Sequence, residues 1–540
     1  MVAAAAGTAR LIIEERNRSV PYRLILIILL ILPLHHLQAE PTQDERFKAL
    51  QDIMPGKTLT PDLLVQIAVL YSDQVQQIGN ALVSRDSARL RVEAGFDTRL
   101  EASASHIDDQ LSTSGGFAPI SNKIQAYSLG AGRLFSTGTS LDARLGYTSS
   151  EQEYAASPFS ASLPGETDEL KLEMNLRQSL WKNQFGRGTG LRLQAAEQGG
   201  KATTHSVEEQ MHGFVLETIR SYYDAWNARE AVQAAEKRRA SQDRLLAIVN
   251  RQNSLGTVEL PDVLQVRASR QSAVDAVSDA RSTFQQIWRS LVVSLKLPSI
   301  LLELDPGRIP MAMDDRLADA RQICAMEESA IRRLETPATR ALQARAAAAG
   351  ANLEAAVDEG RADVYAMAGL QSNSHNDQFT GSFSETGRIK NPRLQLTVGV
   401  SMNLGGSAAT AAAAEALQGR RDAELQLSQT RDGRVTNWLN QCRNLRRMEG
   451  LVRSLEQVHQ LNERRAVLEE KRFRLGRKDA FSVLQANDMA TNSGLNLNRT
   501  RAQLRILAWS LKKLRGDMKE YLEELRQRPA PGQDQREQTH

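Results

Sequence analysis

Apolar and polar residues alternate along several segments of the chain. Between 170 and 176, and again between 394 and 404, every second residue is Leu, Val or Met. A weaker alternation runs over 364–370, and another candidate covers 90–102. A period of two sustained in this way predicts strands with one apolar and one polar face, as in a wall between lipid and water. A soluble β-sandwich produces the same pattern, so any single strand leaves both interpretations open.

An additional pair of strands is expected between the first and the later candidates. Residues 125–149 alternate in the same way around a Phe-Ser-Thr-Gly turn signal at 135–138. Polar loops rich in Ser, Gly or Pro are expected at 103–124, 150–168 and 371–391. Long loops at one end of the strands and short turns at the other are typical of outer-membrane barrels.

Other segments have helical periodicity. Residues 215–226 carry Val, Ile, Tyr and Trp at spacings of four, three and four, and 191–250 contains no proline. The arms from 197 to 256 and from 415 to 476 are 59 and 61 residues long, which corresponds to ~90 Å of helix. Helices this long need partner helices along their length, so we expect long coiled hairpins.

The chain is predicted to be internally duplicated. Leu-Gly followed by Val-Leu-Gln occurs at 255–265 and again at 475–485, which is an offset of 475 − 255 = 220 residues. A repeat this long indicates a duplicated supersecondary unit, which here reads as helix, strands, long helix, tight turn and return helix. The expected divisions are a first repeat at 60–297, a linker at 298–336, a second repeat at 337–518 and a polar C-terminal tail at 519–540.

The N-terminal segment indicates export. Residues 24–32 are an apolar run after Arg23, and Ala39 is a plausible last residue of a secretory signal spanning 1–39. Residues 40–59 would then be an N-terminal periplasmic segment. A buried N-terminal helix is the alternative. No later run is apolar for long enough to span a bilayer as a helix, so we expect membrane entry only as a closed barrel.

Composition excludes several functional classes. The 68 basic and 64 acidic residues are nearly balanced, which argues against nucleic acid as a partner. Two cysteines are too few for a disulfide scaffold or a cysteine-rich zinc module. The common catalytic motifs are absent, the Gly-x-Gly-x-Gly at 186–190 lacks a βαβ unit, and the histidines have no ligand spacing. We therefore expect no enzyme activity, catalytic residues, cofactor or metal site.

Longer motifs resemble a known family. The strand-to-helix junction at 180–188, its continuation at 195–197 and the tip sequences at 255–265 and 474–486 are similar to those of the TolC family of outer-membrane efflux and secretion channels. The resemblance implies a homotrimer in which three chains close one β-barrel in the outer membrane and continue as a periplasmic α-barrel. It implies a passive exit duct for efflux or type I secretion. The implied partners are outer-membrane lipid, a periplasmic adaptor protein and an inner-membrane pump of the RND or ABC type.

The resemblance also implies docking residues. Gly256, Thr257, Gly476 and Arg477 match the helix-to-helix turns where the family's adaptor binds. A plain helix C-cap is the alternative explanation for both glycines.

The positions of an expected constriction near the tips are not aspartates in this chain. In part of the family an acidic ring narrows the tunnel, and the matching positions in this chain are Ser482 and Gln485. Asp479 and Asp488 lie nearby, and Asp262 matches the family's Asp pattern in the first unit only. The candidate periplasmic constriction is therefore Asp262, Asp479, Ser482 and Gln485, and this composition does not favour cation-selective gating.

Two further points stay open at this stage. The resemblance implies four strands per chain and twelve per trimer, whereas the hairpin at 125–149 would raise these numbers to six and eighteen, unless it folds outside the barrel. Cys324 and Cys442 would both lie in an oxidising periplasm, but their pairing depends on geometry that the sequence does not supply.

Two other functional classes compete with a channel. A periplasmic adaptor, or membrane fusion protein, would have one helical hairpin flanked by two halves of a small soluble β domain. A secreted coiled-coil structural protein would leave the apolar strand faces unexplained.

Overall fold

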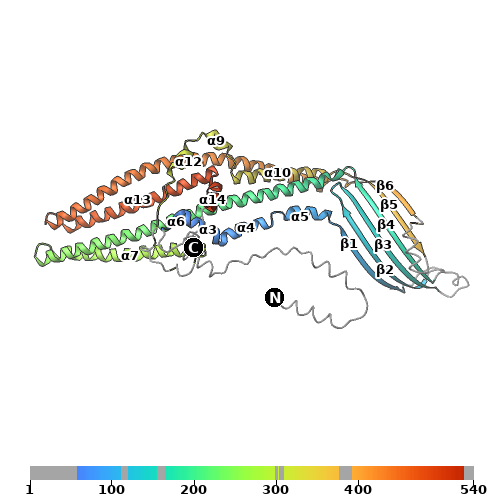
Figure 1. Ribbon diagram of the computed structural model, residues 1–540, viewed down its shortest axis with the longest axis horizontal. Coiled ribbons are helices and arrows are strands. Elements are labelled where there is room, and N and C mark those ends of the chain that lie inside the picture. The colour runs from blue at the N-terminus through green and yellow to red at the C-terminus, as the bar shows by residue number, and fades with distance from the viewer. Residues whose placement is uncertain are drawn as a thin grey trace, which may run out of the picture. The chain divides into compact units, whose positions relative to one another are not determined.

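The computed structural model describes residues 58–110, 119–154, 165–297, 302, 309, 311–375, 389 and 392–527. All of them belong to one unit, Met54–His540, in which a β-sheet stands at one end of several long helices (Figure 1). The expected combination of long helical hairpins and strands is therefore confirmed. The expected signal at 1–39 and most of the segment at 40–59 lie outside the described residues.

The helices follow a duplicated order. The first set comprises α3 (Pro61–Tyr71), α4 (Asp73–Val83), α5 (Ser87–Glu93), α6 (Arg187–Ser254) and α7 (Leu260–Ser294). The second set comprises α10 (Pro337–Glu359), α12 (Ser407–Arg474) and α13 (Ala480–Arg515). The starts of α6 and α12 are separated by 407 − 187 = 220 residues, and those of α7 and α13 by 480 − 260 = 220. Both α6 and α12 have 68 residues, or ~100 Å of helix. This offset equals the one predicted from the tip sequences.

The long helices are held by buried apolar stripes. Val215, Ile219 and Tyr222 on α6 are fully buried, and Trp226 is 8% exposed. Along its length α6 packs against α7, α10 and α13. Tyr222 also donates a hydrogen bond from its hydroxyl to the Leu59 carbonyl oxygen, 2.8 Å away. Packing along this stripe, rather than helix propensity alone, stabilises a helix of this length. None of the described helices combines the length and apolar character needed to cross a membrane.

All the described strands form one antiparallel sheet. Its strands are β1 (Arg99–Asp109), β2 (Pro119–Leu134), β3 (Thr139–Tyr154), β4 (Glu166–Ser179), β5 (Asp363–His375) and β6 (Pro392–Ser401). Their spatial order is the same as their order along the chain, and each neighbouring pair is antiparallel. The hairpin expected at 125–149 therefore lies inside the sheet, between β1 and β4 (Figure 1).

Several sequence-based boundaries are wrong. Residues 90–96, expected as strand, belong to α5 and to the 3₁₀ turn η2 (Ala94–Phe96). The short alternation there also fits a helix, and α5 packs against α6 while Arg89 pairs with Glu93 one turn later at 3.5 Å. The expected loops are shorter than predicted, because β1 to β5 extend into 103–124, 150–168 and 371–391. The remaining parts of these loops lie mostly outside the described residues.

The junction between β4 and α6 depends on glycines. At Gly186, which has φ +82°, an added Cβ would lie 1.7 Å from the Ser136 carbonyl oxygen in the β2–β3 turn. At Gly188 an added Cβ would lie 2.6 Å from a carboxylate oxygen of Asp358. Asp358 is buried at the end of α10 and accepts a 2.8 Å hydrogen bond from the Asn183 backbone N–H. The Gly-x-Gly-x-Gly segment is thus a close-packed strand-to-helix turn.

The linker and the C-terminal segment contain additional helices. Within the expected linker, α8 (Leu317–Cys324) and α9 (Glu328–Arg333) pack on α12. The expected polar tail at 519–540 is wrong in its first part, because α14 (Met518–Gln527) is a helix with Met518, Tyr521 and Leu525 buried. These three residues share one helical face, although the composition of the segment is polar.

Candidate functional site

The two hairpin tips have the same backbone geometry. Gly256 and Gly476 have φ values of +72° and +70° and each follows the C-cap leucine of its helix, α6 or α12. In the first tip the N–H groups of Gly256 and Thr257 donate to the carbonyl oxygens of Asn253 and Gln252, both at 2.9 Å. In the second tip the equivalent bonds from Gly476 and Arg477 measure 2.9 and 3.0 Å. This is the Schellman motif, in which glycine occupies the left-handed position after the helix.

The Schellman geometry by itself explains why glycine occurs at both tips. The C-cap alternative therefore accounts for these glycines without a partner protein. The same geometry leaves the outer surface of both tips exposed. An added Cβ at Gly256 or Gly476 would have nothing within 4 Å, so the turn rather than crowding selects glycine there.

An apolar core joins the two tips. Gln252 of the first tip donates from Nε2 to the Phe473 carbonyl oxygen of the second, at 3.4 Å. The buried side chains shared by the tips are Leu245, Val249, Val263, Val266, Phe473, Ala480, Val483 and Leu484. The two hairpin ends therefore present one combined surface instead of two independent turns.

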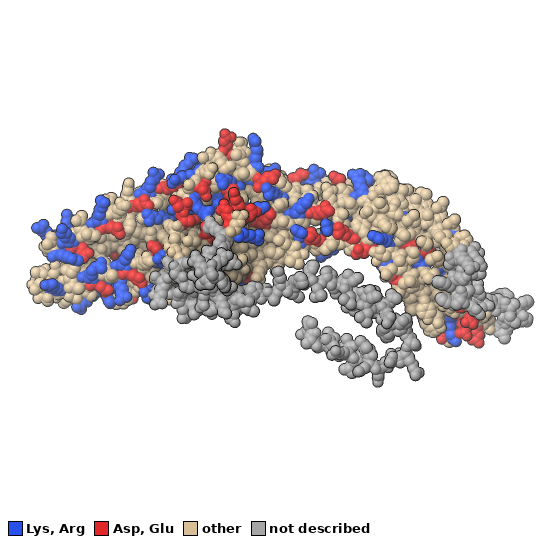
Figure 2. All heavy atoms as spheres, in the orientation of Figure 1, with Lys and Arg blue, Asp and Glu red and all other residues tan. Residues whose placement is uncertain are grey.

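That combined surface is apolar and basic. Leu255, Leu475 and Phe481 are 69%, 62% and 52% exposed. Around the second tip the exposed basic residues are Lys471, Arg472, Arg474, Arg477 and Lys478. Two acidic residues, Glu469 and Glu470, form ion pairs there with Arg472 and Arg474. Figure 2 shows basic side chains at this end of α12 and α13.

The four candidate constriction residues differ in their local roles. Asp479 is the N-cap of α13 and accepts a 3.0 Å hydrogen bond from the Ser482 backbone N–H. Hydrogen bonds from Ser482 keep the pKa of the Asp479 carboxyl below its usual value. Gln485 is exposed about one turn further along α13, and Asp262 occupies the position equivalent to Ser482 in the first hairpin. A constriction formed by these residues stays a prediction about the assembled protein.

The sheet has two chemically different faces. One residue row crosses all six strands through Leu100, Ala131, Ala143, Met174, Leu370 and Leu394. The adjacent row, one residue along each strand, consists of Glu101, Gly130, Arg144, Glu173, Gln371 and Arg393. Leu394 is 79% exposed although it is apolar. An exposed apolar face opposite a charged face indicates a sheet with different solvents on its two sides.

A polar network, which sequence analysis missed, ties distant segments together. The Arg316 guanidinium donates to both carboxylate oxygens of Asp62 at 3.1 Å and lies 4.6 Å from the Trp509 ring centroid. Tyr521 donates to Asp62 at 2.9 Å, and Trp509 donates from Nε1 to Asp314 at 2.8 Å. Burial raises the pKa of Tyr521 above its usual range. These partners are too far apart in sequence for a local motif to reveal them.

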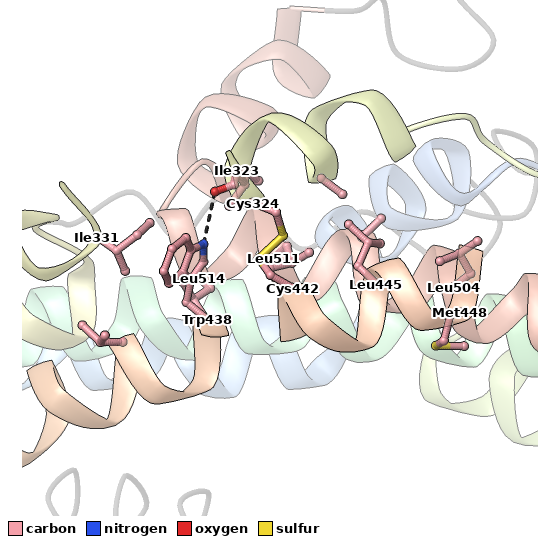
Figure 3. Close-up of a cluster of buried hydrophobic side chains, with 13 residues drawn as sticks. Ile323, Cys324, Ile331, Trp438, Cys442, Leu445, Met448, Leu504, Leu511 and Leu514 are labelled. Atoms are coloured by element: carbon pink, nitrogen blue, oxygen red, sulfur yellow. Dashed lines mark hydrogen bonds between the residues drawn. A yellow bond between two sulfur atoms is a disulfide. The ribbon is translucent and has the colours of Figure 1, made fainter. Parts of the chain in front are cut away.

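A disulfide fastens the linker to α12. Cys324 and Cys442 are bonded with a Cα–Cα distance of 5.5 Å, which answers the question left open by the sequence. In Figure 3 the bond lies among buried apolar side chains, and Trp438 donates from Nε1 to the Ile323 carbonyl oxygen at 3.1 Å. Such a bond persists in oxidising compartments.

The geometry defines a class of fold: two long helical hairpins, each preceded by strands of a shared amphipathic sheet. No protein-family model matches the sequence. No curated protein matches it either.

Solved structures of outer-membrane channels are similar to most of the chain. The Campylobacter jejuni CmeC outer membrane channel has 12% identity and a TM-score of 0.61, over 86% of this chain and 89% of that one. Vibrio cholerae VceC has 14% identity and a TM-score of 0.59, over 88% and 99%. The open Neisseria gonorrhoeae MtrE channel has 14% identity and a TM-score of 0.57, over 84% and 88%. The chain therefore has the fold of these outer-membrane channels, which confirms the expected TolC-like fold.

Proposed function

We propose that this protein is the outer-membrane channel component of a tripartite efflux or type I secretion system. It would act as a passive exit duct, while an inner-membrane pump of the RND or ABC type supplies the energy. The observation that carries the proposal is the residue row across the sheet that is apolar on every strand, beside a charged row one residue away. Lipid on one face and water on the other is the environment that this pattern suits.

The proposal includes a homotrimer. Within the described residues, β1 and β6 each have a neighbouring strand on one side only. Unpaired backbone groups cost several kcal/mol each in hydrocarbon, so a membrane-embedded sheet must pair these edges with other copies. The long hairpins of three copies would then line a tunnel across the periplasm, ~100 Å in length.

The tips are the proposed docking site for a periplasmic adaptor protein. Gly256, Thr257, Gly476 and Arg477 all lie on exposed turns at the ends of the hairpins. Because exposed basic side chains surround the second tip, we propose that the adaptor surface is acidic at the contact. Exposed Leu255 and Leu475 supply apolar area that a partner would bury.

The two alternative classes fit less well. A periplasmic adaptor requires one hairpin between two halves of a β domain, whereas the described part of this chain has two long hairpins and one continuous sheet. A coiled-coil structural protein leaves the exposed apolar face of β6 without a role.

Fractionation tests the proposed location. Cells expressing the full chain are separated into inner-membrane, outer-membrane and soluble fractions, and each fraction is run on a gel with and without heating. We expect trimers in the outer-membrane fraction that dissociate to monomers when heated. Recovery of the protein entirely in the soluble fraction would contradict the proposal.

Substitution of both tip glycines tests docking. Gly256→Val combined with Gly476→Val should abolish transport while trimers still form, because the left-handed turn is strained by a branched side chain. The matched control is Gly199→Val with Gly450→Val, one on each long helix, where an added Cβ also has nothing within 4 Å. Transport is read as dye accumulation in a strain lacking the native gene. Normal transport by the tip variant would exclude these turns as the docking site.

A further inference from the structure

We infer that the β2–β3 hairpin is a full segment of the membrane wall, so that the trimer closes eighteen strands instead of the twelve implied by the family resemblance. The inference rests on the proposed function, because it takes the trimer and the membrane location from there. The six described strands of each chain, taken from three copies, give eighteen. The alternative is that this hairpin folds away from the barrel as an external flap or an internal plug.

The apolar surface of the sheet continues through the hairpin without interruption. Ala131 on β2 pairs with Leu100 of β1 on one side and with Ala143 of β3 on the other. Ala143 pairs in turn with Met174 of β4. A flap outside the membrane would have no need to align its apolar face with that of its neighbours. A shift of one residue in strand pairing would turn its apolar side chains to the opposite face, but the observed pairing keeps Ala131 and Ala143 in the same row as Leu100 and Met174.

The polar surface continues in the same way. Gly130 of β2 lies between Glu101 of β1 and Arg144 of β3, and Arg144 pairs with Glu173 of β4. Arg144 also donates to the Ser128 hydroxyl at 3.0 Å. The charged side of the hairpin is thus the charged side of the whole sheet. In a closed barrel this side faces water.

The hairpin is also fixed at the end of the sheet nearest the helices. Its turn packs against Gly186, where an added Cβ would lie 1.7 Å from the Ser136 carbonyl oxygen. Gln178 of β4 donates from Nε2 to the Thr137 carbonyl oxygen at 3.1 Å. The Ser179 backbone N–H donates to the Gly138 carbonyl oxygen at 3.4 Å. The turn is therefore part of the junction from which α6 begins.

Edge lengths and strand parity allow eighteen strands to close. The two edge strands are similar in length, with 11 residues in β1 and 10 in β6. An even number of strands per copy makes the pairing between β6 of one copy and β1 of the next antiparallel, as at every other position in the sheet.

A wider outlet follows from the strand number. Barrel diameter grows roughly in proportion to strand number, so eighteen strands give a barrel roughly 1.5 times as wide as twelve, and barrels of this size retain an aqueous channel. Size selection would then fall to the helical tunnel rather than to the barrel.

Single-cysteine labelling of trimers in outer-membrane vesicles tests the inference. Both native cysteines are bonded to each other, so an introduced thiol is the only free one. Ala143→Cys and Arg144→Cys probe the two faces of the hairpin, and Val398→Cys and Thr397→Cys probe the two faces of β6, outside the hairpin. The probe is a charged maleimide that does not cross membranes. Trimer formation by each variant is checked on an unheated gel.

We expect Arg144→Cys and Thr397→Cys to react, and Ala143→Cys and Val398→Cys to react at least roughly tenfold more slowly, because only the thiolate is nucleophilic and hydrocarbon suppresses its formation. Fast labelling of Ala143→Cys with slow labelling of Val398→Cys would overturn the eighteen-strand wall and leave the proposed function intact. Fast labelling of both apolar-face variants would overturn the membrane location itself, and the inference with it.

Discussion

At the scale of single residues, His212 is a buried and incompletely hydrogen-bonded side chain in the helical region. It lies on α6, is 3% exposed, and its Nδ1 has no hydrogen-bond partner among the described residues. Burial lowers the pKa of His212 from its ordinary value of 6.5, while Glu209 acts in the opposite direction and Lys513 in the same direction. A neutral imidazole is therefore part of the folded state.

This makes stability depend on pH in a definite direction. Because the pKa of His212 is lower in the folded than in the unfolded chain, the unfolded chain binds more protons as the pH falls below 6.5. The contribution of His212 to the free energy of unfolding is thus complete above pH 6.5 and is lost as the pH falls toward the folded-state pKa. The effect is measured by urea unfolding above and below pH 6.5.

His212→Gln should reduce this pH dependence, since glutamine does not titrate. His205→Gln, at a half-buried position on the same helix, is the control and should preserve more of it. Equal pH dependence of the wild type and His212→Gln would contradict the assignment.

At the scale of elements, the linker is held on the second hairpin at several points. The Cys324–Cys442 bond and the Trp438 side chain attach the end of α8, and Arg332 of α9 pairs with Asp432 of α12 at 2.7 Å. The disulfide closes a loop with a sequence separation of 118 residues. Loops of this length gain the most from cross-linking, because the unfolded chain loses the most conformational freedom.

Removing the disulfide should destabilise the fold without unfolding it. Replacing Cys324 and Cys442 together with alanine is expected to lower the free energy of unfolding by roughly 2–4 kcal/mol. Calorimetry should show a lower melting temperature, and reduction of the wild type should lower it similarly. Alkylation provides the direct check, because a protein mass that is the same with and without reductant would show that the bond is absent.

At the level of secondary-structure elements, part of the fold could be predicted from the sequence. The strands at 170–176 and 394–401 were predicted because alternation persists there, whereas at 90–96 a short alternation also suited a helix packed on α6. The tip glycines were identifiable because a tight turn between two long helices needs a left-handed residue. The contacts of Arg316 could not be predicted from the sequence, because Asp62 and Trp509 approach it only through tertiary packing.

At the scale of the whole molecule, a single chain leaves two requirements unmet: covering the apolar face of its sheet and pairing the outer edges of that sheet. Apolar side chains such as Leu396 and Val398 on β6 are 88% and 75% exposed. Within the described residues the edges of β1 and β6 have no strand beside them. The membrane-embedded trimer proposed above would meet both requirements, because lipid would cover the apolar face and neighbouring copies would pair with the edges.

The mass of the particle extracted from outer membranes tests this account most directly. Native mass spectrometry in detergent should give a mass equal to three processed chains, and heating should convert it to single chains. A compact monomer that stays soluble in aqueous buffer without detergent would contradict the account.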